Sequence, residues 1–191
     1  MQLAGRDKNG QELLELNVFH PRREEPTSPS NLALEGYVRE VVSHTDRRDL
    51  LMRFFGWPNM EAIPGRITGR IADQHEQPRD VVIVAFVNRR PVGYIDVARF
   101  SAHPDTAELG MLLRTDMQRR GIGQAMRQET LHVLREEGVS YLEIRIHPDN
   151  RKIQNARQKW SQTEELRVVA FRRSIEDGEM SYTLALESQS L

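Results

Sequence analysis

The residues best suited to chemistry form a glycine-containing turn between Gln118 and Ala125. An apolar run of strand length precedes the turn, and the residues after it have the apolar spacing of a helix. The first amides of a helix have no acceptor within the helix, and the helix dipole adds positive potential there. Glycine at positions 121 and 123 lets a ligand approach these amides closely. The pattern therefore predicts an anion site that suits a pyrophosphate.

Other phosphate-binding motifs fit this turn less well. A dinucleotide-binding fold expects a third glycine where this chain has Met126, and a nucleotide P-loop requires a Lys-Ser or Lys-Thr pair that is missing. An ordinary tight turn remains an alternative, because short glycine motifs recur in many proteins. The position of the turn after three expected strands favours the anion site.

Composition excludes several classes of function. The 191 residues contain no cysteine, which rules out a thiol nucleophile, a disulfide and a thiolate metal site. The six histidines are scattered without the i, i+4 spacing of a helical metal-binding pair, so we expect no metal. The formal net charge of −1 predicts no general attraction to nucleic acid or to an anionic membrane. No apolar run approaches the roughly 20 residues of a membrane span, and charges interrupt the N-terminus where a secretory signal would be apolar, so we expect a cytoplasmic protein.

The remaining elements place the turn late in one domain, which we expect to cover residues 1–191. Apolar spacing and turn residues predict the order βαα(α)βββαβαββ. Strands are expected at Leu14–Phe19, Asp80–Val87, Val92–Phe100, Ala107–Leu113, Tyr141–Ile146, Leu166–Ile175 and Glu179–Leu186, and helices from Asn31, at Arg47–Phe55, Met60–Ala72, Gly121–Gly138 and Asn150–Trp160.

Gln118-Arg119-Arg120-Gly121-Ile122-Gly123 resembles the cofactor motif of the GNAT acetyltransferase superfamily. That motif begins with Arg or Gln, which is followed by two variable residues, Gly, one variable residue, and Gly or Ala. The resemblance extends to the element order and implies an α/β (α+β) fold, with a mixed, mostly antiparallel central sheet of about seven strands flanked by helices. Three short fragments are most similar to Pat-type bacterial protein lysine acetyltransferases, namely Arg53-Phe54-Phe55-Gly56, Ala107-Glu108 and Asn150-Arg151.

The resemblance implies an N-acetyltransferase in which a primary amine attacks the thioester of acetyl-CoA directly. Glu108 matches the position of the general base, and the Leu113 N–H that of the oxyanion donor. The backbone of residues 111–113 is implied to pair with the pantetheine arm, and Asn150 to hydrogen-bond it. The residues implied to hold acetyl-CoA are Met111, Leu112, Leu113, Gln118, Arg119, Arg120, Gly121, Ile122, Gly123, Gln124, Ala125 and Asn150.

Alternatives remain for these roles. Glu108 also fits a strand residue paired with a neighbouring Arg, and Asn150 a helix N-cap. The helix from Asn150 lacks the tyrosine that many relatives use as general acid, although Pat-type members commonly lack it too. A non-catalytic module that binds acyl-CoA is therefore the second hypothesis. A protein lysine is slightly preferred over a small-molecule amine as acceptor, and the oligomeric state stays open.

Overall fold

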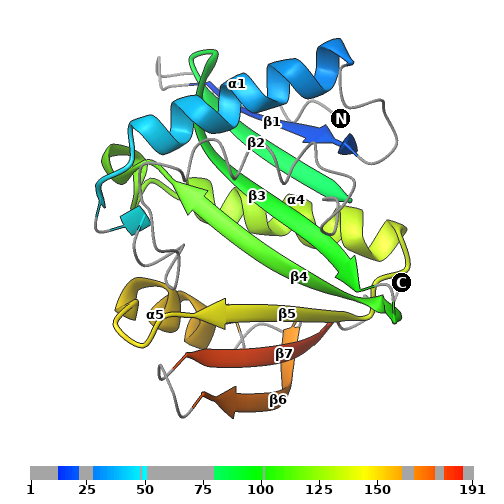
Figure 1. The fold of residues 1–191 in the computed structure, drawn as a ribbon. Coiled ribbons are helices and arrows are strands. Elements are labelled where there is room, and N and C mark those ends of the chain that lie inside the picture. Colours follow the sequence, from blue (N-terminus) through cyan, green and yellow to red (C-terminus); the bar gives the residue numbers. More distant parts are fainter. Residues whose placement is uncertain are drawn as a thin grey trace.

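The computed structural model describes residues 13–21, 28–47, 49–50, 80–100, 102–160, 166–174 and 179–186. Of the two helices expected between Arg47 and Ala72, only residues 47, 49 and 50 are described, and these are helical. The elements, shown in Figure 1, are β1 (Leu14–Phe19), α1 (Pro29–Ser43), β2 (Val81–Val87), β3 (Arg90–Phe100), β4 (His103–Leu113), the short 3-10 helix η3 (Thr115–Met117), α4 (Ile122–Glu136), β5 (Tyr141–Ile146), α5 (Arg151–Trp160), β6 (Leu166–Arg173) and β7 (Met180–Leu186).

The strands form a seven-stranded sheet in the order β1-β2-β3-β4-β5-β7-β6. Every neighbouring pair is antiparallel except β4 and β5, which are parallel. The expected mixed, mostly antiparallel sheet is therefore confirmed. Strand β4 begins at His103, four residues before the expected start at Ala107. His103 to Asp105 are exposed, so no apolar pattern marks them as a strand.

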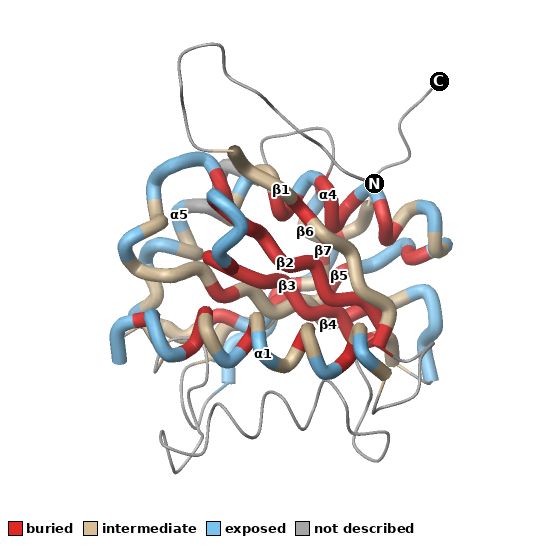
Figure 2. The backbone as a smooth tube through the Cα atoms, turned by 90° about the horizontal axis from the view of Figure 1, so that it is seen from above, coloured by how far each residue is buried: buried red, intermediate tan, exposed pale blue. Residues whose placement is uncertain are grey.

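Strand β2 is buried along its whole length because helices cover both faces of the sheet (Figure 2). Alternate β2 residues enter two cores. Val82, Val84 and Phe86 pack with α1 in the α1-side core. The others belong to the α4-side core, which α4 covers. A strand enclosed on both faces requires the near-continuous apolar run that the sequence shows.

Capping residues, a proline and glycines mark the ends of helices α1 and α4. The Ser28 hydroxyl accepts from the Asn31 N–H at 3.2 Å and Pro29 opens α1, an arrangement typical of a helix start. Gly121 is the N-cap of α4, and Gly138 follows its end with a φ of +74°. None of the helices in the described ranges is long and apolar enough to span a membrane.

The hairpin between β2 and β3 is tighter than expected. Asn88 and Arg89 have φ angles of +50° and +63°, typical of a two-residue type I′ turn. Strand β3 therefore starts at Arg90, and Pro91 lies inside it rather than in the turn. The β2–β3 register shifts between Ala85 and Phe86, beside this proline, which has no N–H to donate.

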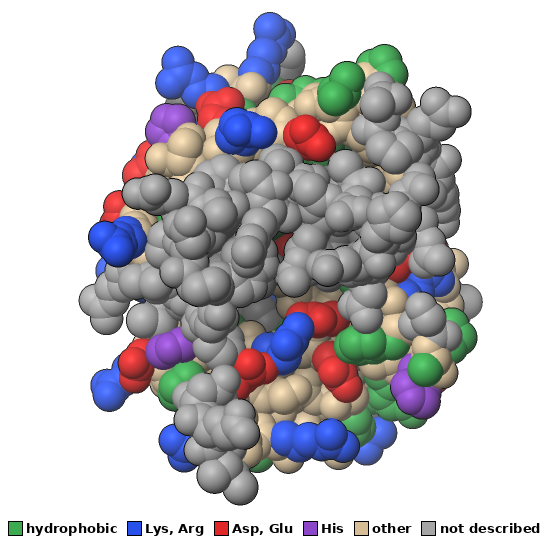
Figure 3. Space-filling view, in the orientation of Figure 1, with side chains coloured by type: hydrophobic (Ala, Val, Ile, Leu, Met, Phe, Trp, Pro, Cys, Tyr) green, Lys and Arg blue, Asp and Glu red, His purple; other side chains and the backbone are tan. Residues whose placement is uncertain are grey.

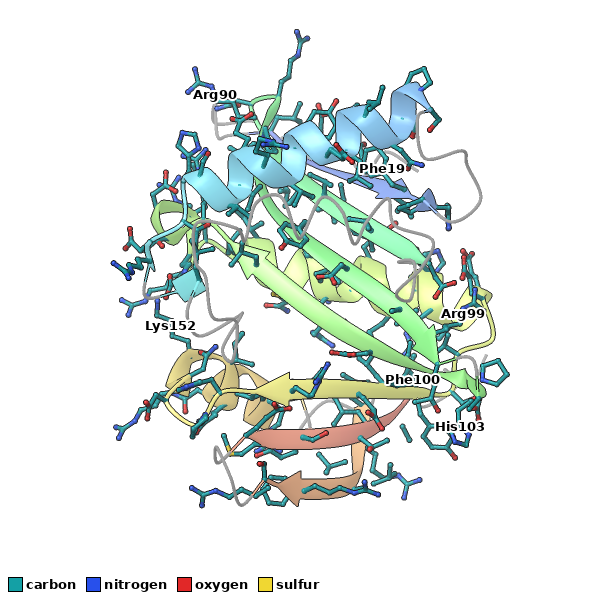
Figure 4. All side chains as sticks on the ribbon, viewed as in Figure 1. Phe19, Arg90, Arg99, Phe100, His103 and Lys152 are labelled. Atoms are coloured by element: carbon teal, nitrogen blue, oxygen red, sulfur yellow. The ribbon has the colours of Figure 1, made fainter. Side chains whose placement is uncertain are left out.

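A charged cluster ties the far end of α4 to the sheet. The Arg99 N–H donates to Asp80 Oδ2 at 2.6 Å, and the Arg99 guanidinium contacts Glu137 Oε2 at 2.6 Å. Figure 4 shows Arg99 near the end of β3. Since Glu137 caps the C-terminal end of α4, this cluster fixes the helix along the sheet and so helps to hold its N-terminal end in place.

Replacing Gly93 by Ala is expected to destabilise the fold by about 1–3 kcal/mol, because an added methyl group overpacks the crossing of β3 and β4. Its Cβ would lie 2.8 Å from Leu113 Cδ1 and 3.0 Å from the Leu112 carbonyl oxygen. Urea denaturation measures the change. The control is Gly36→Ala in α1, where an added Cβ meets nothing within 4 Å and stability should rise by up to about 1 kcal/mol. Equal stability of the two variants would contradict this prediction.

Candidate active site

Strands β4 and β5 pair over a short stretch and then separate. Residues 106–109 of β4 pair with residues 141–144 of β5, whereas residues 110–113 continue beyond the paired stretch. Figure 1 shows the two strands diverging toward α5. We call this parting of β4 from β5 the split. Among the described residues no strand pairs with the edge of residues 110–113 that faces away from β3. A strand edge without a neighbour presents free N–H and C=O groups, with which an extended ligand can pair as if it were a strand.

Alternate residues of β4 direct their main-chain N–H and C=O groups toward the split. The Arg114 N–H donates to the Val92 carbonyl of β3 at 2.9 Å. Because backbone groups alternate along an antiparallel ladder, Leu112 also faces β3, whereas Met111 and Leu113 direct their N–H groups to the opposite edge. Two of the three expected β4 residues thus offer main-chain groups to the split. Leu112, which was expected to hold acetyl-CoA with them, faces β3 with its main chain and is buried in the α1-side core with its side chain, so the structure does not place it in the split.

The turn before α4 has a backbone suited to an anion. Arg119 and Gly121 have φ angles of +64° and +80°, while Arg120 between them does not have a positive φ. Positive φ angles on both sides of Arg120 turn the backbone sharply, and turns of this kind can direct neighbouring amides toward one point, as in known anion-binding concavities. A positive φ at the non-glycine Arg119 costs free energy, which fits a functional turn.

The first turn of α4 extends this concavity. The Ile122 side chain is buried in the α4-side core and anchors the helix start. The amides of Ile122 and Gly123 lie in the first turn, where no intrahelical acceptor exists. A Cβ on Gly123 would lie 3.7 Å from Met111 Sδ. The amides at the start of α4 are therefore next to the open end of β4.

Three residues at the ends of the motif have their own N–H groups already bonded. Gln118 donates to the Thr115 carbonyl at 3.4 Å. Gln124 and Ala125 both donate to the Gly121 carbonyl, at 3.0 and 3.1 Å. The amides offered to an anion therefore centre on the middle of the motif.

A polar network holds this turn against α5. Gln118 Nε2 donates to Asp49 Oδ2 at 2.7 Å, and Lys152 Nζ donates to Asp49 Oδ1 at 3.0 Å and to Gln118 Oε1 at 2.8 Å. The Thr115 hydroxyl also donates to Asp49 Oδ2, at 3.0 Å. Figure 4 shows Lys152 at the start of α5, on the side where β4 and β5 diverge. The Gln118 side chain therefore links separate segments rather than being free for a ligand.

The network sets the charge state of Asp49. Burial of the carboxyl favours its neutral form, but hydrogen bonds from Lys152, Gln118 and Thr115 outweigh that effect and lower the pKa of Asp49. The carboxylate therefore stays charged and keeps all three partners. Sequence reasoning missed Asp49 and Lys152 because they are 103 positions apart, and no local pattern connects them.

Glu108 lies on the α1 side of the sheet, where β4 and β5 begin to part. Its neighbours Ala107 and Leu109 belong to the α4-side core, so Glu108 faces the other way. The Arg145 guanidinium of β5 binds Glu108 Oε1 and also lies 3.8 Å from Glu179 Oε1. Figure 3 shows acidic and basic side chains together on this face, over β5 and β7. The ion pair expected for a strand glutamate is thus present, at the base of the split.

Asn150 is the N-cap of α5. Its Oδ1 accepts from the Ile153 N–H at 3.2 Å, and its carbonyl accepts from the Gln154 N–H at 3.1 Å. The helix-cap interpretation is therefore confirmed. Contact between Asn150 and a ligand stays a prediction, which the cap does not exclude because the side-chain amide nitrogen is not used in it.

Comparisons with known proteins agree with this geometry. A family model described as an acetyltransferase (GNAT) domain matches residues 34–160, more than half of the chain. No protein of curated function matches the sequence at a significant level. The GNAT domain of S. lividans PAT is 18% identical, with 97% of each chain covered and a TM-score of 0.67.

Two further solved structures share the fold. An acetyltransferase from Thermus thermophilus is 18% identical, with 91% of this chain and 97% of that chain covered and a TM-score of 0.61. The structure of yncA from Salmonella typhimurium, determined with its cofactor acetyl-CoA, is 13% identical, with 92% and 95% covered and a TM-score of 0.54. At these identities the similarity is one of fold.

Replacing Asp49 by Asn is expected to lower the free energy of unfolding at pH 7 by about 1 kcal/mol, since ion pairs with exposed lysines are screened. A carboxyl whose pKa is lowered by folding stabilises the protein above its unfolded pKa of about 3.9, and that stability disappears as the pH falls through the folded value. Denaturation at several pH values should therefore show the difference between variant and wild type closing below about pH 4. Asp116→Asn is the control, because exposed Asp116 pairs with nearby Arg114 and joins no distant segments. A D49N protein as stable as wild type at pH 7 would contradict the role of the network.

Proposed function

The chain belongs to the GNAT acetyltransferase family and is an N-acetyltransferase; from this premise we propose that it transfers the acetyl group of acetyl-CoA to a primary amine. The observation that carries the proposal is the open edge of β4 beside the amides at the start of α4. Such an edge suits an extended amide-containing arm, and the amides suit the pyrophosphate to which that arm is joined.

The donor site is built from main-chain groups. Met111 and Leu113 would pair with the pantetheine arm across the split, and the amides of Gly121, Ile122 and Gly123 would bind the pyrophosphate. The solved yncA structure supports this proposal, because it is a protein of this fold determined with acetyl-CoA. Asn150 would contact the arm through the amide nitrogen that its cap does not use.

Bound acetyl-CoA supplies a thioester whose carbonyl carbon is the electrophile. The Leu113 N–H, directed into the split, would donate to the carbonyl oxygen as negative charge develops there. Glu108 would take a proton from the attacking amine, directly or through a water molecule, as the N–C bond forms and the C–S bond breaks. The sulfur leaves as the CoA thiolate, and among the described residues we assign no general acid to protonate it.

A protein lysine is the acceptor that we favour. The support is the similarity of Ala107-Glu108 and Asn150-Arg151 to Pat-type enzymes, together with the fold shared with the GNAT domain of S. lividans PAT. This support is analogy, since one fold serves many substrates. Incubation with acetyl-CoA and a cell lysate, followed by mass analysis of acetylated proteins and small molecules, separates the acceptor classes.

A module that binds acyl-CoA without catalysis is the second candidate. It is favoured by the helix α5, Arg151–Trp160, which contains no tyrosine to act as general acid. Release of free CoA in the presence of a panel of amines and protein lysines distinguishes the two. Tight binding of acetyl-CoA without release on any acceptor would favour the module.

Replacing Gly121 by Ala is expected to weaken CoA binding about tenfold or more, measured by calorimetry, because Gly121 needs its positive φ to aim the turn amides. Gly123→Ala should bind CoA nearly as well as wild type, since the motif accepts Ala at this position and the added Cβ would meet only Met111 Sδ, at 3.7 Å. Gly138→Ala is the matched control, since Gly138 has a φ of +74° and open space around it, as Gly121 does. It should lose comparable stability while keeping its affinity for CoA, and equal affinities in all three variants would contradict the assigned site.

Glu108→Gln is expected to lower turnover by about 10²–10⁴-fold, because an amide cannot accept the proton of the amine. Affinity for acetyl-CoA should be unchanged, since the donor site is made of other groups. Steady-state release of CoA measures turnover. The control is Glu143→Gln, the β5 residue in register with Glu108. Wild-type turnover in E108Q would remove Glu108 from the mechanism.

A further inference from the structure

We propose that Arg145 is a positioning residue for acetyl transfer, which holds the Glu108 carboxylate at the base of the split with one defined oxygen directed to the amine. This inference rests on the proposed role of Glu108 as general base. It concerns a residue on β5, the strand opposite β4, and thereby assigns a function to the second wall of the split.

The position of Arg145 along β5 brings it to Glu108. Glu143 is the register partner of Glu108, and Ile144 is the last β5 residue paired with β4. Arg145 is therefore the first β5 residue beyond the paired stretch, and alternation places it on the same face as Glu143. From there its guanidinium reaches back across the parting strands to Glu108.

The geometry of the pair defines the orientation of the carboxylate. Arg145 Nε donates to Glu108 Oε1 at 3.1 Å, and a terminal guanidinium nitrogen of Arg145 donates to the same oxygen. Both contacts use Oε1, so Oε2 is left outside the pair and is the oxygen available to an amine or a water molecule. A planar guanidinium with fixed donors restricts the rotation of its partner more than a lysine ammonium does.

A third group steadies the guanidinium. Arg145 Nε lies 3.8 Å from Glu179 Oε1, at the start of β7. The guanidinium thus lies between carboxylates that come from the two neighbours of β5, Glu108 of β4 and Glu179 beside β7. Both contacts favour the side-chain conformation of Arg145 that reaches Glu108.

The exposed fractions of the two side chains indicate that the pair orients the Glu108 carboxylate more than it stabilises the fold. The Glu108 side chain is 19% exposed, whereas that of Arg145 is 53% exposed. Ion pairs with one partner so exposed contribute little to folding stability, because water and salt screen them. A proton acceptor, in contrast, loses activity when its direction is disordered, since proton transfer requires hydrogen-bond geometry.

The test compares Arg145→Gln and Arg145→Lys in the wild-type and E108Q backgrounds. In the wild-type background we expect R145Q to lower kcat about 10- to 100-fold and R145K to lower it less, because lysine keeps the charge without the planar fork. The KM and the calorimetric Kd for acetyl-CoA should stay unchanged in both variants. In the E108Q background R145Q should cause no further loss, because no base remains to be positioned. Glu179→Gln, which weakens the longer contact, should have a smaller effect than R145Q.

Two outcomes would overturn the inference. If R145Q lowers kcat by the same factor in both backgrounds, Arg145 acts independently of Glu108, and the proposed function survives without this positioning role. If R145Q weakens acetyl-CoA binding instead of kcat, Arg145 belongs to the donor site. Should R145Q fail to fold, as judged by thermal denaturation, R145K in the two backgrounds provides the same comparison. Wild-type turnover in E108Q alone would remove Glu108 from the mechanism and this inference with it. The distinct result that rejects the proposed function is a wild-type protein that releases no CoA with any amine or protein lysine.

Discussion

The parting of β4 from β5 after four paired residues is the constraint on which the candidate site depends. If the two strands stayed paired to their ends, the N–H groups of Met111 and Leu113 would bond to β5 and be unavailable. Strand β3 pairs with the other edge of β4 as far as Leu113, so β4 is held in place beyond the end of its pairing with β5. An open but rigid strand edge can bind an extended ligand without paying for its own ordering.

The elements around the split keep its two walls in place. The α4-side core buries Ile122 and Met126, which fixes the start of α4 next to β4, and the network of Asp49, Gln118 and Lys152 joins that start to α5. On the other face Arg145 links β5 to Glu108 of β4. Polar contacts thus span the opening where backbone pairing has ended, and each wall carries part of the proposed chemistry.

Sequence patterns predicted the elements well where burial alternates or is continuous. Strand β5 has the expected bounds, and the enclosed strand β2 differs by one residue. The start of β4 was missed because His103 to Asp105 are exposed. Within the site, the glycine turn was found because glycine marks a conformation directly. The pairing of Glu108 with an arginine was one of the sequence-based alternatives, but neither the identity of that arginine nor the partners of Gln118 were predicted. A pattern shows which face a residue occupies and not which distant side chain it meets.

Amide hydrogen exchange, resolved by residue with and without acetyl-CoA, tests the central claim that main-chain groups of β4 and α4 bind the donor. We expect the amides of Met111, Leu113, Ile122 and Gly123 to become protected when acetyl-CoA binds. The Leu112 amide, which faces β3, should already be protected and change little. Saturating acetyl-CoA that leaves the exchange of these four amides unchanged would contradict the assignment of the split as the donor site.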